Sequence, residues 1–402
     1  MDNCIVHFLP AKAGDCFVVE FDNGECILVD CGYKSTYETE LKPLLIQLKQ
    51  KGCRVILMLI THIDQDHIEG AIAFLCENGP ACAPQIIEVE NIWFNGFFNT
   101  LFMRDEFQER KRTAIGDLQK KRMNMVLGQL SMQINGDAGP ISAAHSRSFE
   151  ELCAQHGYRL NAQFVDRVVK RSADSRNQLV DHSIQIGECK LIVLSPNEAS
   201  LDRLAHKLNV EMIRNFGVHY ELSEHMEFAA LFERLMELQF DPGGFEEHIS
   251  ASEPRLERWI GTSTLAQMNE VNNASIVIEI EYKGLKLLYT GDSDSDSWAK
   301  FLTDEYDMIK ISHHGTTKPN IRLMEKAKGK TILISTDGGR QNRHPENDLL
   351  ARAILNGNKM IYFNYDIRQK QELMDMQGEY GYSVMFGHRE IRLYRIIVWS
   401  NT

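Results

Sequence analysis

Residues 61–70 read Thr-His-Ile-Asp-Gln-Asp-His-Ile-Glu-Gly and directly follow the apolar run 55–60. This stretch contains four side chains that bind metal ions well: His62, Asp64, Asp66 and His67. A continuous apolar run is typical of a strand covered on both faces. Ionisable groups at the end of such a strand cost several kcal/mol each when they are buried without a partner. A bound cation would remove that cost, so the pattern His-x-Asp-x-Asp-His predicts a metal site.

Further ionisable residues follow three other apolar runs: Asp30 after 26–29, Asp292 after 285–289, and His313 with His314 after 308–311. If these runs are strands side by side in one sheet, their ends form a single pit on a rigid scaffold, where catalytic groups usually sit. Histidine with carboxylate suits zinc or manganese, and the high oxygen content favours harder ions than an all-histidine site would. We therefore expect two divalent ions, zinc or manganese.

The elements that must position these residues follow from hydrophobic periodicity. Strands are predicted at 17–21, 26–29, 54–60, 189–194, 276–282, 285–289, 308–311, 331–334, 360–363 and 392–398. Helices are predicted at 39–51, 68–75, 145–160, 200–240 and 345–355, with further helical periodicity within 101–135. Asp22-Asn23-Gly24 predicts a tight hairpin turn. Loops are expected at 241–244 and 250–254.

Composition limits the classes of function. The chain has 402 residues and a formal net charge of −12, which argues against loose, charge-driven binding to nucleic acid or an anionic membrane but leaves room for a local basic groove. The N-terminus lacks the features of a signal peptide, and no apolar run approaches the ~20 residues needed to span a bilayer. The nine cysteines are scattered and form no CxxC pair. They indicate reduced core thiols in a cytoplasmic protein with no membrane partner.

With these residues in view, the chain resembles the metallo-β-lactamase-fold hydrolase superfamily. Within it, the chain is similar to the branch of the DNA-uptake (ComEC-type) hydrolase domains and the phosphorylcholine esterases. The superfamily motif is His-x-His-x-Asp-His, and this branch commonly has Asp at its second position, as Asp64 here. Other matching segments are Phe8-Leu9 through Gly14-Asp15, 28–32, Asn273-Ala274-Ser275, 289–292, 311–315 and Arg343-His344-Pro345. The resemblance covers roughly 1–95, 180–200 and 270–365.

The resemblance implies an α+β fold, an αββα sandwich with the metals at one edge between the sheets. It implies a single domain over 1–402, with helical insertions at about 96–180 and 200–265. The insertions have no counterpart in the superfamily. We expect them to form a cap over the pit, or an interface with a second copy of the chain or another protein, and the sequence leaves these alternatives open.

The resemblance also implies a role for each site residue. His62 and Asp64 would bind the first metal, Asp66 and His67 the second, and Asp292 would bridge the two. One of the adjacent histidines would bind the second metal, with His314 favoured over His313, and the other would contact a substrate phosphate. Asp66 would also orient the attacking hydroxide, which makes Asp66, His313 and His344 the expected catalytic residues; for His344 a plain loop role stays open.

Three further residues are expected around the ligands rather than among them: Asp30, Asn273 and Ser195. Asp30 would orient a metal ligand. Ser195 marks a departure from the family pattern, because the superfamily's third ligand for the first metal is a histidine following the strand at 189–194, and Ser195-Pro196 stands there instead. The first site is therefore expected to be weak, completed by water, or filled only with substrate.

The leading hypothesis is a metal-dependent hydrolase in which a hydroxide bridging two ions attacks the phosphorus of a phosphodiester. A nuclease follows from the DNA-uptake resemblance, although the acidic net charge and the lack of a basic-aromatic stretch give it little support. One alternative is a phosphodiesterase acting on a small ligand, such as a cyclic nucleotide or choline phosphate. Another is a catalytically weak sensing or interaction module that uses its helical inserts as a partner surface.

Overall fold

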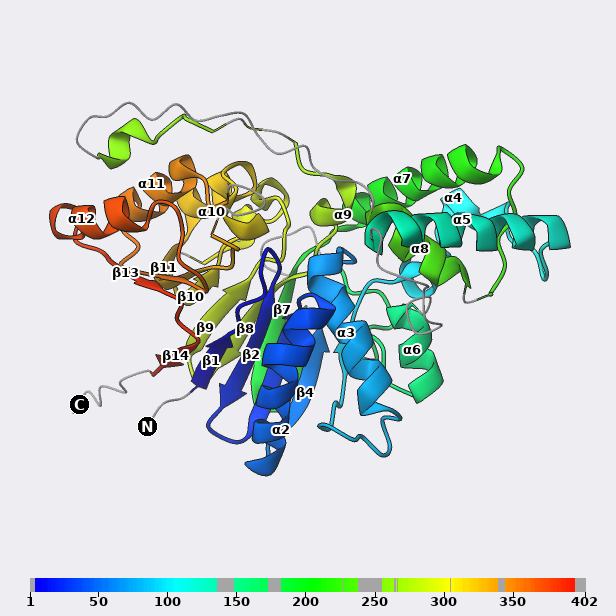
Figure 1. The fold of residues 1–402 in the computed structure, drawn as a ribbon, viewed down its shortest axis with the longest axis horizontal. Coiled ribbons are helices and arrows are strands. Elements are labelled where there is room, and N and C mark those ends of the chain that lie inside the picture. Colours follow the sequence, from blue (N-terminus) through cyan, green and yellow to red (C-terminus); the bar gives the residue numbers. More distant parts are fainter. Residues whose placement is uncertain are drawn as a thin grey trace.

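The computed structural model describes residues 4–135, 148–172, 182–225, 227–237, 255–263, 265, 267–303, 305–338 and 344–394. Within them, two β-sheets pack face to face and helices cover their outer faces (Figure 1). None of the described helices is long and apolar enough to cross a membrane.

The first sheet has the strand order β14-β1-β2-β3-β4-β5. Its strands are β1 (Cys4–Phe8), β2 (Cys16–Phe21), β3 (Glu25–Cys31), β4 (Arg54–Leu59), β5 (Ile92–Trp93) and β14 (Glu390–Leu393). The predicted hairpin is confirmed: β2 and β3 are antiparallel, and Gly24 supplies the positive φ of 81° that the turn requires. β3 runs parallel to β4, so both carboxyl ends reach the same edge of the sheet.

The second sheet has the order β13-β12-β11-β10-β9-β8-β7-β6. Its strands are β6 (Ile184–Ile186), β7 (Cys189–Ser195), β8 (Val277–Tyr282), β9 (Leu285–Tyr289), β10 (Glu305–Lys310), β11 (Lys328–Ile334), β12 (Met360–Phe363) and β13 (Ser383–Phe386). The strands from β9 to β13 are all parallel, so their carboxyl ends also share one edge.

The layer between the sheets is dry and aromatic. Phe8 and Phe17 of the first sheet stack with ring centroids 5.1 Å apart, and Phe17 meets the edge of Tyr289 from the second sheet at 5.5 Å. Alternate residues of β2 face opposite sides: Phe17 points into this layer, and Val18 points toward the helices. Both faces of the strand are buried, which explains the continuous apolar runs in the sequence.

Helices α1 (Lys34–Thr36), α2 (Lys42–Gln50) and α3 (Gln65–Asn78) pack on the outer face of the first sheet, with a π-helical turn at Tyr37–Leu41 between the first two. Helices α10 (Ile321–Lys326), α11 (Asn347–Leu355) and α12 (Lys370–Tyr380) cover the second sheet and enclose a separate apolar cluster. β1, α12 and β13 were not predicted. The predicted strand 392–398 is described only as far as residue 394.

Most of the described helices in the predicted insertions gather at one side of the sandwich (Figure 1): α4 (Asp105–Gln108), α5 (Asp117–Asn135), α6 (Phe149–His156), α7 (Glu198–Phe216) and α8 (Glu227–Glu237). The short helix Leu256–Arg258 packs instead in the apolar cluster of α11, and α9 (Glu270–Asn273) follows the second insertion. The single helix predicted at 200–240 is wrong: Gly217, with φ of 87°, ends α7, and α8 follows separately. Phe228 and Phe232 of α8 share one apolar cluster with Phe74 of α3. The loops predicted at 241–244 and 250–254 lie outside the described residues.

Candidate metal centre

The predicted site residues meet where the carboxyl ends of strands from both sheets come together. Asp30 ends β3 and His62 follows β4 in the first sheet, whereas Asp292 follows β9 and His314 follows β10 in the second. The expectation that these strands share one sheet is therefore wrong. The two edges meet because the sheets pack face to face, and the amide of Ile276 donates to the carbonyl of Thr61 across them at 2.9 Å.

Helix α3 carries two of the predicted ligands. It begins at Gln65, earlier than the predicted residue 68, and Asp64 occupies its N-cap position with extended backbone angles. Asp66 and His67 therefore lie in the first helical turn rather than in a loop. A carboxylate in the first turn is favoured by the helix dipole, which accounts for a start inside the motif. The helix holds both side chains rigidly toward the pit.

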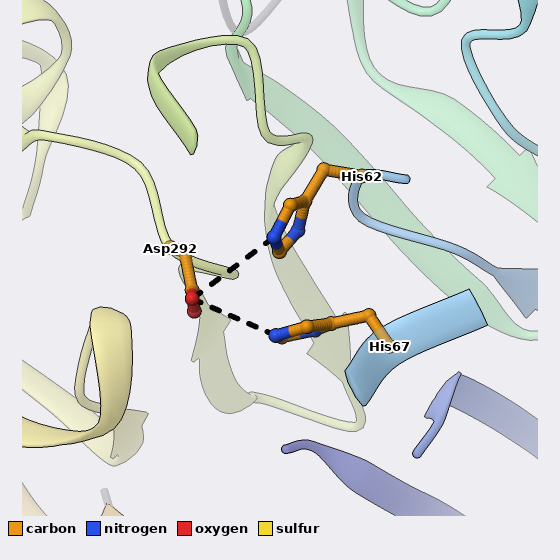
Figure 2. A group of neighbouring side chains, drawn as sticks. All are labelled: His62, His67 and Asp292. Atoms are coloured by element: carbon orange, nitrogen blue, oxygen red, sulfur yellow. Dashed lines mark ion pairs between the residues drawn. The ribbon is translucent and has the colours of Figure 1, made fainter. Parts of the chain in front are cut away.

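Three imidazole nitrogens point at one carboxylate oxygen. The Nε2 atoms of His62, His67 and His314 lie 4.0, 3.6 and 3.3 Å from Oδ2 of Asp292. Figure 2 shows the rings of His62 and His67 turned toward Asp292. The Nε2 atoms of His62 and His67 are buried and have no hydrogen-bond partner among the described residues. Buried polar atoms without partners are costly, and a cation between them would satisfy them.

Two further carboxylates complete the ligand set. Oδ2 of Asp66 lies 3.4 Å from Nε2 of His314, and Oδ1 lies 3.9 Å from Nε2 of His67. Oδ2 of Asp64 lies 3.4 Å from Nε2 of His62. The structure thus brings together all six residues predicted as metal ligands. Five of them form two groups, His62-His67-Asp292 and Asp66-His67-His314, which overlap at His67, and Asp64 lies beside His62. This donor set fits one or two divalent ions.

Asp30 contacts His67 directly and His62 through Thr61. Its Oδ2 lies 2.9 Å from Nδ1 of His67, and its two oxygens accept hydrogen bonds from the amide and hydroxyl of Thr61 at 2.7 and 2.8 Å. The Thr61 hydroxyl lies 3.0 Å from Nδ1 of His62. Asp30 sits at the position predicted for it, and its backbone has a left-handed φ of 53°, a strained conformation typical of functional sites.

Two buried charged residues beside the centre were missed as site residues. Asp15 forms an ion pair with Lys310, and its Oδ1 lies 3.7 Å from Nδ1 of His314. Nδ1 of His314 also lies 3.2 Å from the carbonyl of Ser335. The available signal was a lysine beside the apolar residues Met308, Ile309 and Ile311, together with Gly14-Asp15 in the family match.

The buried carboxylates of the centre favour positive charge on the histidines beside them, and the pKa values of both kinds of group show this. Burial raises the pKa of Asp66, but the neighbouring His67 and His314 outweigh burial and hold this pKa at about 2. Burial lowers the pKa of His314, yet Asp292 and Asp66 raise it to about 10. The pKa of His67 is likewise raised well above its usual value by Asp292 and Asp30, despite burial. In the absence of an ion, protons on the histidines balance the carboxylates, and a divalent ion would displace those protons.

The remaining predicted residues lie around this centre at different distances. The ring of His313 is 5.9 Å from that of His314 and 5.7 Å from that of His344, whose Nδ1 is buried with no partner among the described residues. Ser195 contacts Ser293, hydroxyl to hydroxyl at 3.3 Å.

The side-chain amide of Asn273 donates a hydrogen bond to the carbonyl of Met268 at 3.2 Å rather than to a metal ligand. Ser275, in the same matching segment but not predicted as a site residue, touches the site instead. The Ser275 hydroxyl accepts a hydrogen bond from the amide of Asp292 at 3.3 Å.

The backbone that carries the second-sheet ligands is unusual. His313, His314 and Gly315 have successive φ values of 48°, 54° and 95°. Left-handed angles at residues other than glycine cost of order 1–3 kcal/mol each and persist only where the surroundings impose them. This turn places the rings of the adjacent residues His313 and His314 5.9 Å apart, both beside the candidate centre.

The sequence comparison with family models places residues 9–131 in a match to the metallo-beta-lactamase superfamily. The matched segment includes Asp30 and the whole motif 61–70. No curated protein matches the chain.

Among solved structures, 43 chains match. One is described as a "putative metal-dependent hydrolase" from Parabacteroides distasonis; the alignment covers 95% of this chain and 92% of that chain, with 12% identity and a TM-score of 0.34. The two sheets between helical layers confirm the predicted α+β sandwich, and residues 9–131, which match the family model, supply the first sheet's strands β2 to β5.

Proposed function

We propose that the protein is a metal-dependent hydrolase that cleaves phosphodiester bonds. The observation that carries the proposal is the convergence of three imidazole nitrogens on Oδ2 of Asp292, with Asp64 and Asp66 beside them. Zinc or manganese suits this mixture of imidazole and carboxylate. When bound, two such ions supply Lewis acidity toward phosphate oxygens and lower the pKa of water.

The protein's own residues divide the remaining work. Asp66 lies at the mouth of the centre with its side chain 19% exposed, so it can orient a water that enters from solvent. His313 is half-buried and lies beside His314, and the half-buried His344 lies beside His313. Their ring nitrogens can donate hydrogen bonds to phosphate oxygens, where negative charge develops during hydrolysis. The oxygen-rich donor set suits phosphate chemistry better than thioester or lactam hydrolysis.

The net charge of −12 favours a small phosphodiester over a polyanion, because a polyanionic nucleic acid would be repelled at long range. A cyclic nucleotide or a choline phosphate is therefore the preferred substrate class within the proposal. Single-stranded DNA and RNA remain arms of the test, since the branch that the sequence resembles includes DNA-uptake proteins.

The test is a double variant, Asp66→Ala with His67→Ala, compared with Glu77→Ala at the other end of α3. Each protein is loaded with Zn²⁺ or Mn²⁺ and assayed on a chromogenic phosphodiester, cyclic nucleotides, choline phosphate esters, single-stranded DNA and RNA. We expect wild type and Glu77→Ala to be active and the double variant to lose roughly 1000-fold or more in turnover, in keeping with the loss of a metal site. Undiminished turnover at equal folding would refute the proposal.

The same experiment separates an enzyme from a sensing module, the alternative motivated by Ser195 in place of a histidine. Elemental analysis of the loaded wild type measures the number of ions per chain. Less than one ion per chain, with no hydrolysis of any substrate under either metal, favours a module that binds partners through its helical insertions.

A further inference from the structure

A buried lysine lies directly behind the candidate metal centre. Lys310 is the last residue of β10, and its side chain is 1% exposed. An ammonium group in a protein interior is costly unless it is paired and hydrogen-bonded. The lysine therefore needs partners, and those it has belong to the network around the metal ligands.

Each of the three ammonium protons has an acceptor. Nζ of Lys310 donates to the carbonyl of Gly291 at 2.9 Å, forms an ion pair with Asp15, and lies 3.5 Å from Oδ1 of Asp292. Burial lowers the pKa of Lys310, but Asp15 and Asp292 outweigh burial and keep it above its usual value. The lysine thus stays charged, and its head group is fixed on three sides.

The two oxygens of Asp292 consequently face different neighbours. Oδ1 faces Lys310, whereas Oδ2 faces the Nε2 atoms of His67 and His314 at 3.6 and 3.3 Å. A carboxylate on a short side chain can rotate and offer either oxygen, or both, to a cation. The contact with Lys310 opposes that rotation.

We propose that Lys310 is a positioning residue that holds Oδ1 of Asp292, so that this carboxylate presents the single oxygen Oδ2 to the metal ions. The inference rests on the proposed function and adds to it how the shared ligand is kept in place. A carboxylate fixed in this way cannot bind one ion with both of its oxygens and leave the other ion without a ligand from Asp292. Replacing a residue that holds a metal ligand in place typically weakens metal binding roughly 10- to 100-fold.

A simpler role for Lys310 is to neutralise Asp15. The two roles are separated by removing the ion pair as a unit: Asp15→Asn with Lys310→Met leaves the net charge unchanged but frees Oδ1 of Asp292. Asp15→Asn alone removes the partner of Lys310 and keeps its contact with Asp292. Lys283→Met is the matched control. Lys283 lies in the turn between β8 and β9, at the end of β9 remote from Asp292, and forms an ion pair with Asp22.

The full-length proteins are checked for folding by circular dichroism and then titrated with Co²⁺, a coloured stand-in for zinc. Affinity is measured by calorimetry, and ligand geometry by the visible absorption of the bound ion. For the double variant we expect roughly 10-fold weaker binding or more, and an altered absorption spectrum. Asp15→Asn and Lys283→Met should keep the wild-type spectrum. If the double variant does not fold, Asp15→Asn with Lys310→Gln replaces it, with the same expected direction.

Wild-type affinity and spectrum in the folded double variant would overturn the inference and leave the metal centre itself standing. The inference is also overturned if Asp15→Asn alone reproduces the change, because the effect would then belong to Asp15. If wild type takes up no Co²⁺ at all, the proposed function fails together with the inference.

Discussion

Nδ1 of His67 lies 2.9 Å from Oδ2 of Asp30, and both side chains are buried. An ionised carboxylate can only accept hydrogen bonds, so the imidazole must carry a proton on Nδ1. This contact leaves Nε2 as the nitrogen that faces Asp292 and Asp66. The carboxylate at the end of β3 thus selects which nitrogen of His67 is offered to a metal.

Replacing Asp30 with Asn should therefore weaken metal binding without removing any ligand. The amide has nearly the same shape, but the group that faces His67 can be a donor instead of an acceptor. We expect a metal dissociation constant roughly 10- to 100-fold higher, measured by competition with a chelator. Asp307→Asn is the control, because Asp307 accepts a hydrogen bond from the amide of Lys286 near the start of β10. Equal weakening in both variants would contradict the assigned role.

The two metal positions should differ in affinity. In the assignment that the family resemblance implies, Asp66, His67, His314 and Asp292 would surround one position with two imidazoles and two carboxylates. The other position would have His62 and Asp64, and would share Asp292. We expect one ion per chain to survive extensive dialysis in wild type and in His62→Ala, and none in His314→Ala. Elemental analysis after dialysis checks this, and equal ion content in the two variants would refute it.

Gly14 should tolerate no side chain, because a Cβ atom there would lie 1.9 Å from the carbonyl oxygen of Asp66. Gly14→Ala must displace the first turn of α3 together with its ligands. We expect a loss of about 1–3 kcal/mol in the free energy of unfolding, typical of overpacking, and weaker metal binding. Gly378→Ala in α12 meets nothing within 4 Å and should stabilise the protein by up to about 1 kcal/mol. Urea denaturation of both variants, with and without metal, is the measurement.

A buried carboxylate in the insertion predicts a pH dependence of stability. Burial raises the pKa of Glu233 to about 8, against hydrogen bonds from the amide of Phe149 at 3.1 and 3.3 Å and the charge of Arg234. Between pH 4.5 and pH 8 the folded state keeps a proton that the unfolded state releases. This contribution to stability is complete below pH 4.5, and it is lost as the pH rises from 4.5 toward 8.

Glu233→Gln keeps an acceptor for Phe149 and cannot ionise. Its free energy of unfolding should therefore fall less steeply with pH, and its advantage over wild type should grow from about pH 5 to pH 8. Glu227→Gln, at the start of the same helix, serves as the control. Parallel pH profiles for wild type and Glu233→Gln would show that the Glu233 carboxyl titrates normally.

The sequence was sufficient for the parts of the site that are local. The motif 61–70 and the polar ends of the apolar runs predicted six ligands, and the structure gathers all six at one edge. The assignment of strands to sheets was not accessible, because periodicity describes each strand by itself and not its partner. The pairing of β1 with β14, elements from opposite ends of the chain, illustrates the same limit.

Residues whose role exists only in the folded state were the ones missed. A lysine near the end of a strand usually reaches solvent until the fold encloses it, so Lys310 within the predicted strand 308–311 was too weak a signal to assign it to the site. Asn273 was assigned to the site, whereas its neighbour Ser275 makes the contact with Asp292. A shift of two residues along an irregular turn cannot be resolved by spacing alone.

The candidate centre draws its ligands from both halves of the sandwich. His62 follows β4 of the first sheet and His67 lies in α3, which packs on that sheet, whereas Asp292 and His314 follow β9 and β10 of the second. An ion bound there would crosslink the N-terminal and C-terminal parts of the chain. Neither part alone presents a complete donor set, so uptake of the ion must follow the docking of the two sheets. Metal content then reports tertiary assembly as much as catalysis. A chelator should weaken the packing between the two sheets before either sheet unfolds.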